Sequence, residues 1–163
     1  GLATDFCVRF TALDALQLHF DTVVIRDACR GVDIPEGTAE SALQEMKQEG
    51  KIRALGVSCH DFGAMKTAAK SPWVDIMLSR LNPYNASMDA SPEEVVALLK
   101  QAKSNGKGII GMKIFGNGTL VDRKEQCMKF AQENGVFDAM TIGATTPQQI
   151  DENLALMAKY PMA

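Results

Sequence analysis

Polar side chains that could bind or activate a substrate follow several apolar stretches of this sequence of 163 residues. The stretch GVSCH ends in Ser58, Cys59 and His60, which can donate or accept protons or, for the thiol, attack a substrate. Arg26 directly follows another apolar run, and Lys113 interrupts the apolar frame IIGMKIF. A lysine in such a frame must reach a polar partner, because burying its charge alone is very costly.

The segment TIGATTPQQIDENL indicates a second kind of chemistry, the binding of an anion. Thr145 and Thr146 precede Pro147 at the start of a predicted helix, whose free N–H groups and dipole can hold a phosphate. Gln149 and Asn153 are four positions apart and share one face of that helix. A helix cap formed by Thr145 or Thr146 explains the same residues, and phosphate binding would be added to that cap.

Each of these residues also has a simpler structural explanation. His60 followed by Asp61 is a common way to enter a helix, and Cys59 is more often a small buried hydrophobic residue than a nucleophile. Arg26 can form an ion pair at the rim of a sheet, and the glycines of GNG fit a tight turn. A thiol enzyme built on Cys59 and His60 stays open as a minor alternative, although no Asn or Asp completes a recognisable triad.

Alternating apolar runs and helical patterns predict the elements that must position these side chains. Five strands are expected, at 22–25, 51–58, 73–82, 107–115 and 136–143. Five helices are expected, at 38–50, 61–71, 91–106, 121–135 and 146–160. This order predicts a parallel α/β sheet, in which the carboxyl ends of the strands lie on one rim. The polar residues named above should therefore converge.

Helix-capping signals delimit the predicted helices. Ser91, Pro92 and Glu94 form a capping-box sequence at the start of the clearest helix. Thr38 and Asp61 are the expected N-caps of the two preceding helices.

Composition excludes several classes of protein. The net charge of −3 and the pI near 5.4, with no basic run, exclude a nucleic-acid-binding surface. No apolar run approaches the roughly 18 residues of a membrane span, so no membrane partner is expected. The four cysteines form no CxxC pair, which argues against a metal site and favours reduced thiols in a cytoplasmic protein. Residues 1–163 are expected to form a single domain, too short for an eight-stranded barrel of about 250 residues.

Three stretches of the sequence resemble the aldo/keto reductase superfamily. GKIRALGVSCHDFGAMKTAAKSPWVD resembles the family's pattern of a helix ending in GKIR before a strand that runs to GVS. TIGATTPQQIDENL resembles the family's closing motif, and SPEEVVALLKQAKSNGKGIIGMKIFGNG resembles a bacterial branch with GMK on its seventh strand. The resemblance extends from about residue 12 onward. It implies an (α/β)8 barrel that binds NADP(H), of which this chain matches strands four to eight, a partial (half) TIM-type barrel.

The resemblance also implies roles for individual residues. The cofactor contacts it implies are Ser58, Gly143, Thr145, Thr146, Gln149 and Asn153. The family's catalytic tyrosine, aspartate and lysine belong to strands one to three, which do not match, and its catalytic histidine aligns with Arg26. Arg26, His60 and Lys113 are then the groups left to polarise a small-molecule carbonyl substrate.

The functional expectation is an aldo/keto reductase-like oxidoreductase with NADP(H)-linked carbonyl or alcohol chemistry, either a fragment or a diverged relative. The isolated chain is expected to turn over poorly because the usual tetrad is missing. The alternative is a non-catalytic ligand-binding or self-assembling half-barrel. Unpaired sheet edges and an open inner face, with residues such as Val24 and Ile110, favour a homo-oligomer. A fragment of a longer reductase and a flavodoxin-like open sheet are the other resolutions.

Overall fold

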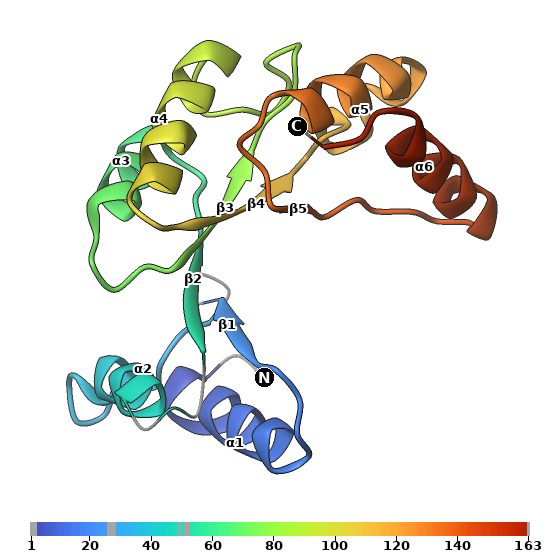
Figure 1. The fold of residues 1–163 in the computed structure, drawn as a ribbon. Coiled ribbons are helices and arrows are strands. Elements are labelled where there is room, and N and C mark those ends of the chain that lie inside the picture. The colour runs from blue at the N-terminus through green and yellow to red at the C-terminus, as the bar shows by residue number, and fades with distance from the viewer. Residues whose placement is uncertain (1–2, 26–28, 49, 51–52, 163) are drawn as a thin grey trace. The chain divides into compact units, whose positions relative to one another are not determined.

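The computed structural model describes residues 3–25, 29–48, 50 and 53–162 (Figure 1). The chain divides into two compact units. The first comprises Gly1–Ser58 and Ser71–Met77, and the second comprises Cys59–Lys70 and Leu78–Ala163. The single domain expected from the sequence stays a prediction, and the two units are described separately.

Five strands follow one another in the sheet in the order of the chain, β1-β2-β3-β4-β5. They are β1 (Val23–Ile25), β2 (Ala54–Ser58), β3 (Ile76–Arg80), β4 (Gly108–Met112) and β5 (Ala139–Met140). The pairing of β1 with β2 and that of β4 with β5 are both parallel. All five strands were predicted, although each is shorter than its apolar run. The prediction of parallel βα units is confirmed.

The first unit packs two α-helices against its short strands. A π-helix, η1 (Thr4–Val8), leads directly into α1 (Arg9–Gln17), and α2 (Thr38–Gln48) lies beside them. Their apolar stripes bury a core cluster formed by Ala12, Val24, Leu43, Met46 and Leu55. Val24 therefore belongs to the helix-covered face of the sheet, and its assignment to an open inner face was wrong. Its partner in the strand register, Leu55, faces the same helices.

Two carboxylates fix the loop between β1 and α2. Asp5 accepts hydrogen bonds from the N–H groups of Val32 and Asp33, both at 2.9 Å, and from the Thr38 hydroxyl at 2.9 Å. Asp33 accepts from the N–H groups of Gly37 and Ala39, at 2.9 and 3.1 Å, and so caps α2. The prediction that Thr38 is the N-cap was wrong, because Thr38 is the first helical residue and its hydroxyl is used by Asp5.

The second unit contains four α-helices. They are α3 (Phe62–Lys70), α4 (Pro92–Ser104), α5 (Lys124–Glu133) and α6 (Pro147–Lys159). Two 3₁₀ turns, η3 (Gly116–Gly118) and η4 (Val121–Arg123), precede α5. The capping box of α4 is present, and Asp61 caps α3 by accepting from the N–H of Ala64 at 2.9 Å. Both caps confirm the sequence predictions.

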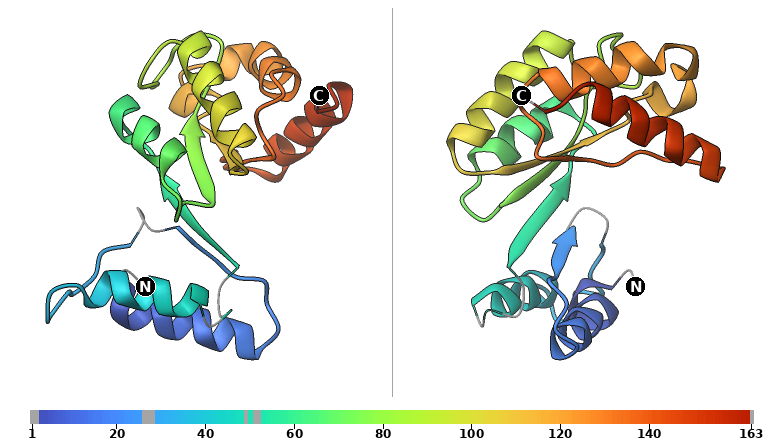
Figure 2. Two further views of the ribbon diagram at one scale, coloured as in Figure 1. Left: turned by 60° about the vertical axis from the view of Figure 1, so that its left-hand side comes forward. Right: turned by 45° about the vertical axis from the view of Figure 1, so that its right-hand side comes forward.

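The helices of the second unit cover one face of its strands. Figure 2 (right) shows α3, α4 and α5 on the same side of β3 and β4. On β4, Ile109 faces the helices and is fully buried, whereas Ile110 points the other way and is half-buried. Leu78 on β3 is half-buried in the same way. Within the described residues, no helix combines the length and the hydrophobicity that crossing a bilayer requires.

Candidate functional site

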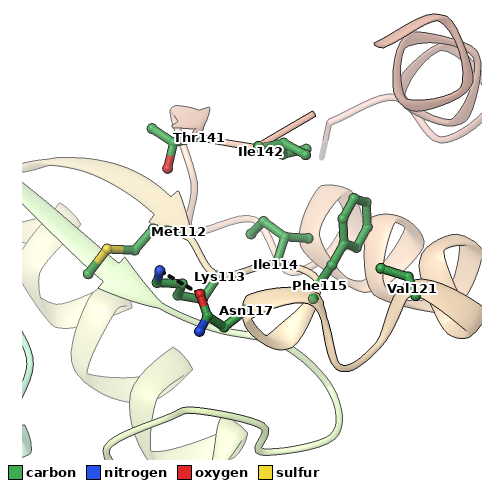
Figure 3. A pocket seen from close by; sticks show the side chains of 10 residues that line it. Met112, Lys113, Ile114, Phe115, Asn117, Val121, Thr141 and Ile142 are labelled. Carbon is green, nitrogen blue, oxygen red and sulfur yellow. Dashed lines mark hydrogen bonds between the residues drawn. The ribbon is translucent and has the colours of Figure 1, made fainter. Parts of the chain in front are cut away.

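A pocket of about 550 Å³ opens at the carboxyl ends of β4 and β5 (Figure 3). Its lining comes from the segments that directly follow these two strands: Met112, Lys113, Ile114, Phe115, Asn117, Gly118, Val121, Thr141, Ile142 and Gly143. Most of these side chains are apolar, and Lys113 contributes the one cation. The volume lies within the usual range of small-molecule sites, about 300–1,000 Å³.

Lys113 stands where β4 ends, and its backbone is left-handed, with φ of 55°. This region is uncommon for a residue other than glycine and raises the energy of the backbone. Its ammonium donates to Asn117 Oδ1 at 2.9 Å (Figure 3). The lysine in the apolar frame thus finds a polar partner at the rim of the sheet, in the pocket, rather than in the core.

The turn after Lys113 requires a glycine at position 116. Gly116 has φ of 55°, and a Cβ atom there would lie within 2.9 Å of Ala86, Thr119 and Leu120 side chains. The Thr119 hydroxyl donates to the Gly116 carbonyl at 2.7 Å and closes the turn. The GNG sequence was interpreted as a tight turn, and the turn carries Asn117 into the pocket.

The carboxyl end of β3 is held by a buried ion pair. The Arg80 guanidinium pairs with Asp89 through two nitrogens, and one of them also donates to the carbonyl of His60 at 3.0 Å. Both charged side chains are largely buried, which suits a planar, bidentate guanidinium–carboxylate pair. Asp89 lies near the end of the loop 82–90 that follows β3, so the ion pair with Arg80 fixes that end of the loop.

Two hydrogen bonds connect Thr145 and Thr146 to Gln149 at the start of α6. The Thr146 hydroxyl accepts from the N–H of Gln149 at 3.3 Å, and Gln149 Oε1 accepts from the N–H of Thr145 at 2.8 Å. Thr146 is the N-cap and Pro147 is the first helical residue. Of the two N-caps that the sequence allowed, Thr145 and Thr146, the structure therefore uses Thr146. A phosphate at this helix end would have to compete with the Gln149 side chain for the N–H of Thr145.

Asn153 lies one turn further along α6. It is 8% exposed, and its Oδ1 has no hydrogen-bond partner among the described residues. A buried amide oxygen without a partner is costly, so Asn153 Oδ1 is open to a hydrogen bond from a water molecule or from a ligand. Figure 1 shows that α6 runs alongside α5, and Asn153 is the one buried residue of α6.

Of the remaining predicted site residues, Ser58 and His60 belong to different units. Ser58 is the last residue of β2, in the first unit. His60 is exposed in the second unit, while Cys59 is 4% exposed and its N–H donates to the Leu78 carbonyl. The burial of Cys59 argues against the thiol-enzyme alternative. Arg26 lies outside the described residues.

Of the nine predicted site residues, Lys113 and Gly143 line one pocket, and Thr145, Thr146 and Gln149 meet at the start of α6. The sequence analysis missed Asn117, Thr141 and Ile142 as pocket residues. Asn117 follows the predicted strand 107–115, and Thr141 and Ile142 stand at the end of the predicted strand 136–143. These positions were the available signal, because pockets of parallel sheets form at the carboxyl ends of strands. The roles of all nine stay predictions.

A second pocket, of about 350 Å³, lies in the first unit between the η1–α1 segment and α2. Phe6, Phe10 and Ile34 are exposed around it. Two charged side chains of this pocket already have partners. Arg9 pairs with Glu45 at 2.8 Å, and Asp5 accepts hydrogen bonds from the loop before α2. Hydrogen bonds to backbone N–H groups and to Thr38 lower the pKa of Asp5 despite its burial, so its carboxylate stays ionised in this structural role.

Comparison with protein families decides where the chain belongs. The profile of the aldo/keto reductase family matches residues 8–141. The chain belongs to the aldo/keto reductase family. The resemblance noted in the sequence is thereby confirmed, and the match covers more than half of the chain.

Solved aldo-keto reductases share the fold of this chain. The holo form of an aldo-keto reductase from Bacillus halodurans superposes with a TM-score of 0.64 at 16% identity, covering 98% of this chain and 64% of that one. An aldo-keto reductase from Pseudomonas aeruginosa superposes with a TM-score of 0.66 at 19% identity, covering 98% and 60%. The prediction of a partial TIM-type barrel is confirmed. The chain spans less than two thirds of the length of these relatives.

A different similarity is confined to a short segment. The nicotinamidase of Escherichia coli is 54% identical over 50 residues, which make up 31% of this chain and 24% of that protein. The nicotinamidase of Acinetobacter baylyi is 46% identical over 53 residues, 32% of this chain and 24% of that protein. The chain thus spans about a quarter of these relatives.

Proposed function

We propose that this chain provides the nucleotide-binding part of an NADP(H)-linked oxidoreductase site that acts on a carbonyl or alcohol substrate. Membership of the aldo/keto reductase family supports oxidoreductase chemistry. The observation that carries the proposal is the pocket beyond β4 and β5, with the Lys113 ammonium at its rim. A cation beside an apolar pocket suits a ligand that joins a planar ring to phosphate groups.

The residues of the second unit fit such a nucleotide. The pocket of about 550 Å³ has room for part of it, and Lys113 can neutralise a phosphate charge. Thr145, Thr146 and Gln149 stand at the start of α6, and Asn153 offers a buried acceptor without a partner in the described chain. These residues, with Gly143, are the proposed cofactor contacts of the second unit, and Ser58 of the first unit stays a contact predicted from the family resemblance. When bound, NADPH would supply the hydride.

If the nicotinamide ring rather than a phosphate lies beside Lys113, its ammonium is instead the pocket group that could stabilise negative charge on a carbonyl oxygen. An ammonium that donates a hydrogen bond to that oxygen favours the state in which the oxygen gains charge. To do so, Lys113 would exchange its bond to Asn117 for one to the substrate. Arg26 and His60 remain further proposed candidates. Slow turnover is expected, because the chain does not match the family segments that carry three of the four usual catalytic residues.

Nucleotide binding tests the proposal directly. Titration of the chain with NADPH, followed by nucleotide fluorescence, should saturate, and Lys113→Met should weaken binding about tenfold, the effect of losing one partly buried charge–phosphate contact. Lys100→Met, an exposed lysine of α4 outside the pocket, is the matched control and should leave affinity unchanged. Asn153→Ala should also weaken binding.

Two outcomes would overturn the proposal. One is the absence of any binding at millimolar NADPH by a folded chain. The other is an equal effect of the Lys113 and Lys100 variants. Binding without oxidation of NADPH in the presence of aldehydes or ketones would favour the non-catalytic alternative over an active reductase.

A further inference from the structure

Asn82 lies two residues beyond the end of β3, and its side chain is fully buried. Its Nδ2 donates to the carbonyl of Ala86 at 2.8 Å and to the carbonyl of Lys113 at 3.4 Å. Its Oδ1 accepts from the N–H groups of Tyr84 and Ala86, at 3.2 and 3.0 Å. A primary amide has two donors and an oxygen that accepts two bonds, so its capacity is fully used by main-chain groups.

Three of these four bonds close a local turn, and one bond does not. The three bonds with Tyr84 and Ala86 span at most four residues and close a local turn, in which an aspartate could make the two accepted bonds but not the donated one. The bond to Lys113 spans 31 residues and joins the end of β3 to the end of β4. That bond requires the length and the donor of an asparagine.

The Lys113 carbonyl receives a second donor, the N–H of Gly116 at 2.8 Å. Two donors from different segments therefore fix the orientation of this peptide group. The left-handed backbone of Lys113 lies above its energy minimum and relaxes unless the surrounding structure holds it. Relaxation would turn the Cα–Cβ bond and carry the ammonium away from Asn117 and from the pocket.

We infer that Asn82 is a positioning residue for Lys113, which it holds in the left-handed conformation that presents the ammonium to the pocket. The inference rests on the proposed function for the identity of the ligand, and on hydrogen-bond geometry for everything else.

A matched control comes from the other end of the same loop. Asp89 pairs with Arg80, and the loop 82–90 runs between Asn82 and this ion pair. Asp89→Asn weakens the pair and loosens the loop, but it leaves the bond from Asn82 to Lys113 in place. An effect that comes only from loop mobility would appear in both variants.

The first test follows Lys113 itself and needs no nucleotide. Lysines of the full chain are reductively methylated with ¹³C-formaldehyde, and the NMR resonance of Lys113 is assigned by its absence in Lys113→Arg. Asn82→Ser keeps a hydroxyl that can accept from Tyr84 but cannot reach the Lys113 carbonyl. It should move the Lys113 resonance towards the positions of exposed lysines, whereas Asp89→Asn should leave it in place. An unmoved resonance in a folded Asn82→Ser chain would overturn the inference.

The second test measures coupling between the two residues. Asn82→Ser should raise the Kd for NADPH about fivefold, the effect of one neutral hydrogen bond. In a Lys113→Met background it should have no further effect, because the group it positions is gone. Equal effects in both backgrounds would contradict the inference.

Two further outcomes are distinguishable. If thermal unfolding shows that Asn82→Ser is not folded, Asn82→Thr replaces it, because threonine also keeps a neutral hydroxyl beside the turn and cannot reach the Lys113 carbonyl. If the wild-type chain binds no NADPH, the proposed function is wrong, and the Lys113 resonance alone then decides whether Asn82 positions this lysine.

Discussion

Asp138 illustrates how a single side chain joins two elements of the second unit. It directly precedes β5, and its carboxylate accepts from the N–H of Ile109 at 2.7 Å and from Lys103 at 2.9 Å. Burial pushes the pKa of Asp138 upward, but the Ile109 N–H and the Lys103 ammonium outweigh it, so the pKa lies below the ordinary value of 3.8. The folded chain therefore favours the ionised form.

This shift predicts a pH-dependent effect of Asp138→Asn. Because the pKa of Asp138 is lower in the folded chain than in the unfolded chain, its ionised form stabilises the fold at pH values above 3.8. This contribution disappears as the pH falls through the pKa of the folded state. Because the pair is partly exposed and screened, we expect the variant to lose only ~1 kcal/mol at pH 7 in urea unfolding. The loss should shrink towards pH 3. Asp151→Asn, an exposed carboxylate of α6, is the control, and an equal loss at both pH values would contradict the assignment.

At the scale of elements, α4 is the helix whose beginning is best defined. The Ser91 hydroxyl accepts from the N–H of Glu94 at 3.3 Å, and the Glu94 carboxylate accepts from the N–H of Ser91 at 3.2 Å. The Ser91 hydroxyl also donates to this carboxylate at 2.8 Å, and these bonds keep the pKa of Glu94 below its ordinary value. Pro92 adds a residue that favours the first helical position.

Removal of the Ser91 hydroxyl, which caps α4, should destabilise the second unit. Ser91→Ala should lower the free energy of unfolding by ~1 kcal/mol, because the N–H of Glu94 loses the hydroxyl that accepts from it. Ser91→Asp should restore most of it, since aspartate caps helices about as well as serine. Chemical denaturation followed by circular dichroism measures both. No difference between alanine and aspartate at this position would show that the cap contributes nothing.

At the scale of the whole molecule, the first unit exposes large apolar side chains. Six of those within its described residues are between 50% and 77% exposed: Phe6, Phe10, Leu18, Phe20, Val32 and Ile34. Apolar surface of this kind favours association with another protein surface. The homo-oligomer expected from the sequence therefore stays a proposal, with these side chains as its contact surface.

Light scattering tests this proposal. The chain should elute with a mass near twice its 17.7 kDa, and Phe10→Ser combined with Ile34→Ser should shift it towards the monomer. Val121→Ser, an equally exposed apolar residue of the second unit, should leave the mass unchanged. A wild-type chain that is monomeric and binds no hydrophobic dye would contradict the proposal.

Local signals in the sequence determined the elements, because hydrophobic period and capping depend on residues close together in the chain. The capping box at Ser91 and the cap at Asp61 are of this kind. Local signals failed at Thr38, because its hydroxyl donates a hydrogen bond to Asp5, which lies 33 residues earlier in the chain. They also failed at Val24, whose face of the sheet is set by packing against α1 and α2.

The position of Lys113 at the end of an apolar strand was visible in the sequence, and it predicted a polar group at the rim of a parallel sheet. Only the tertiary structure decided that the backbone of Lys113 is left-handed, that Asn82 donates a hydrogen bond to its carbonyl, and that its ammonium donates to Asn117. The bond from Asn82 joins two segments that the chain brings together only after the strands have paired, and the contact with Asn117 depends on the turn that follows β4. Sequence spacing specifies which residues reach the rim, and packing decides which of them meet.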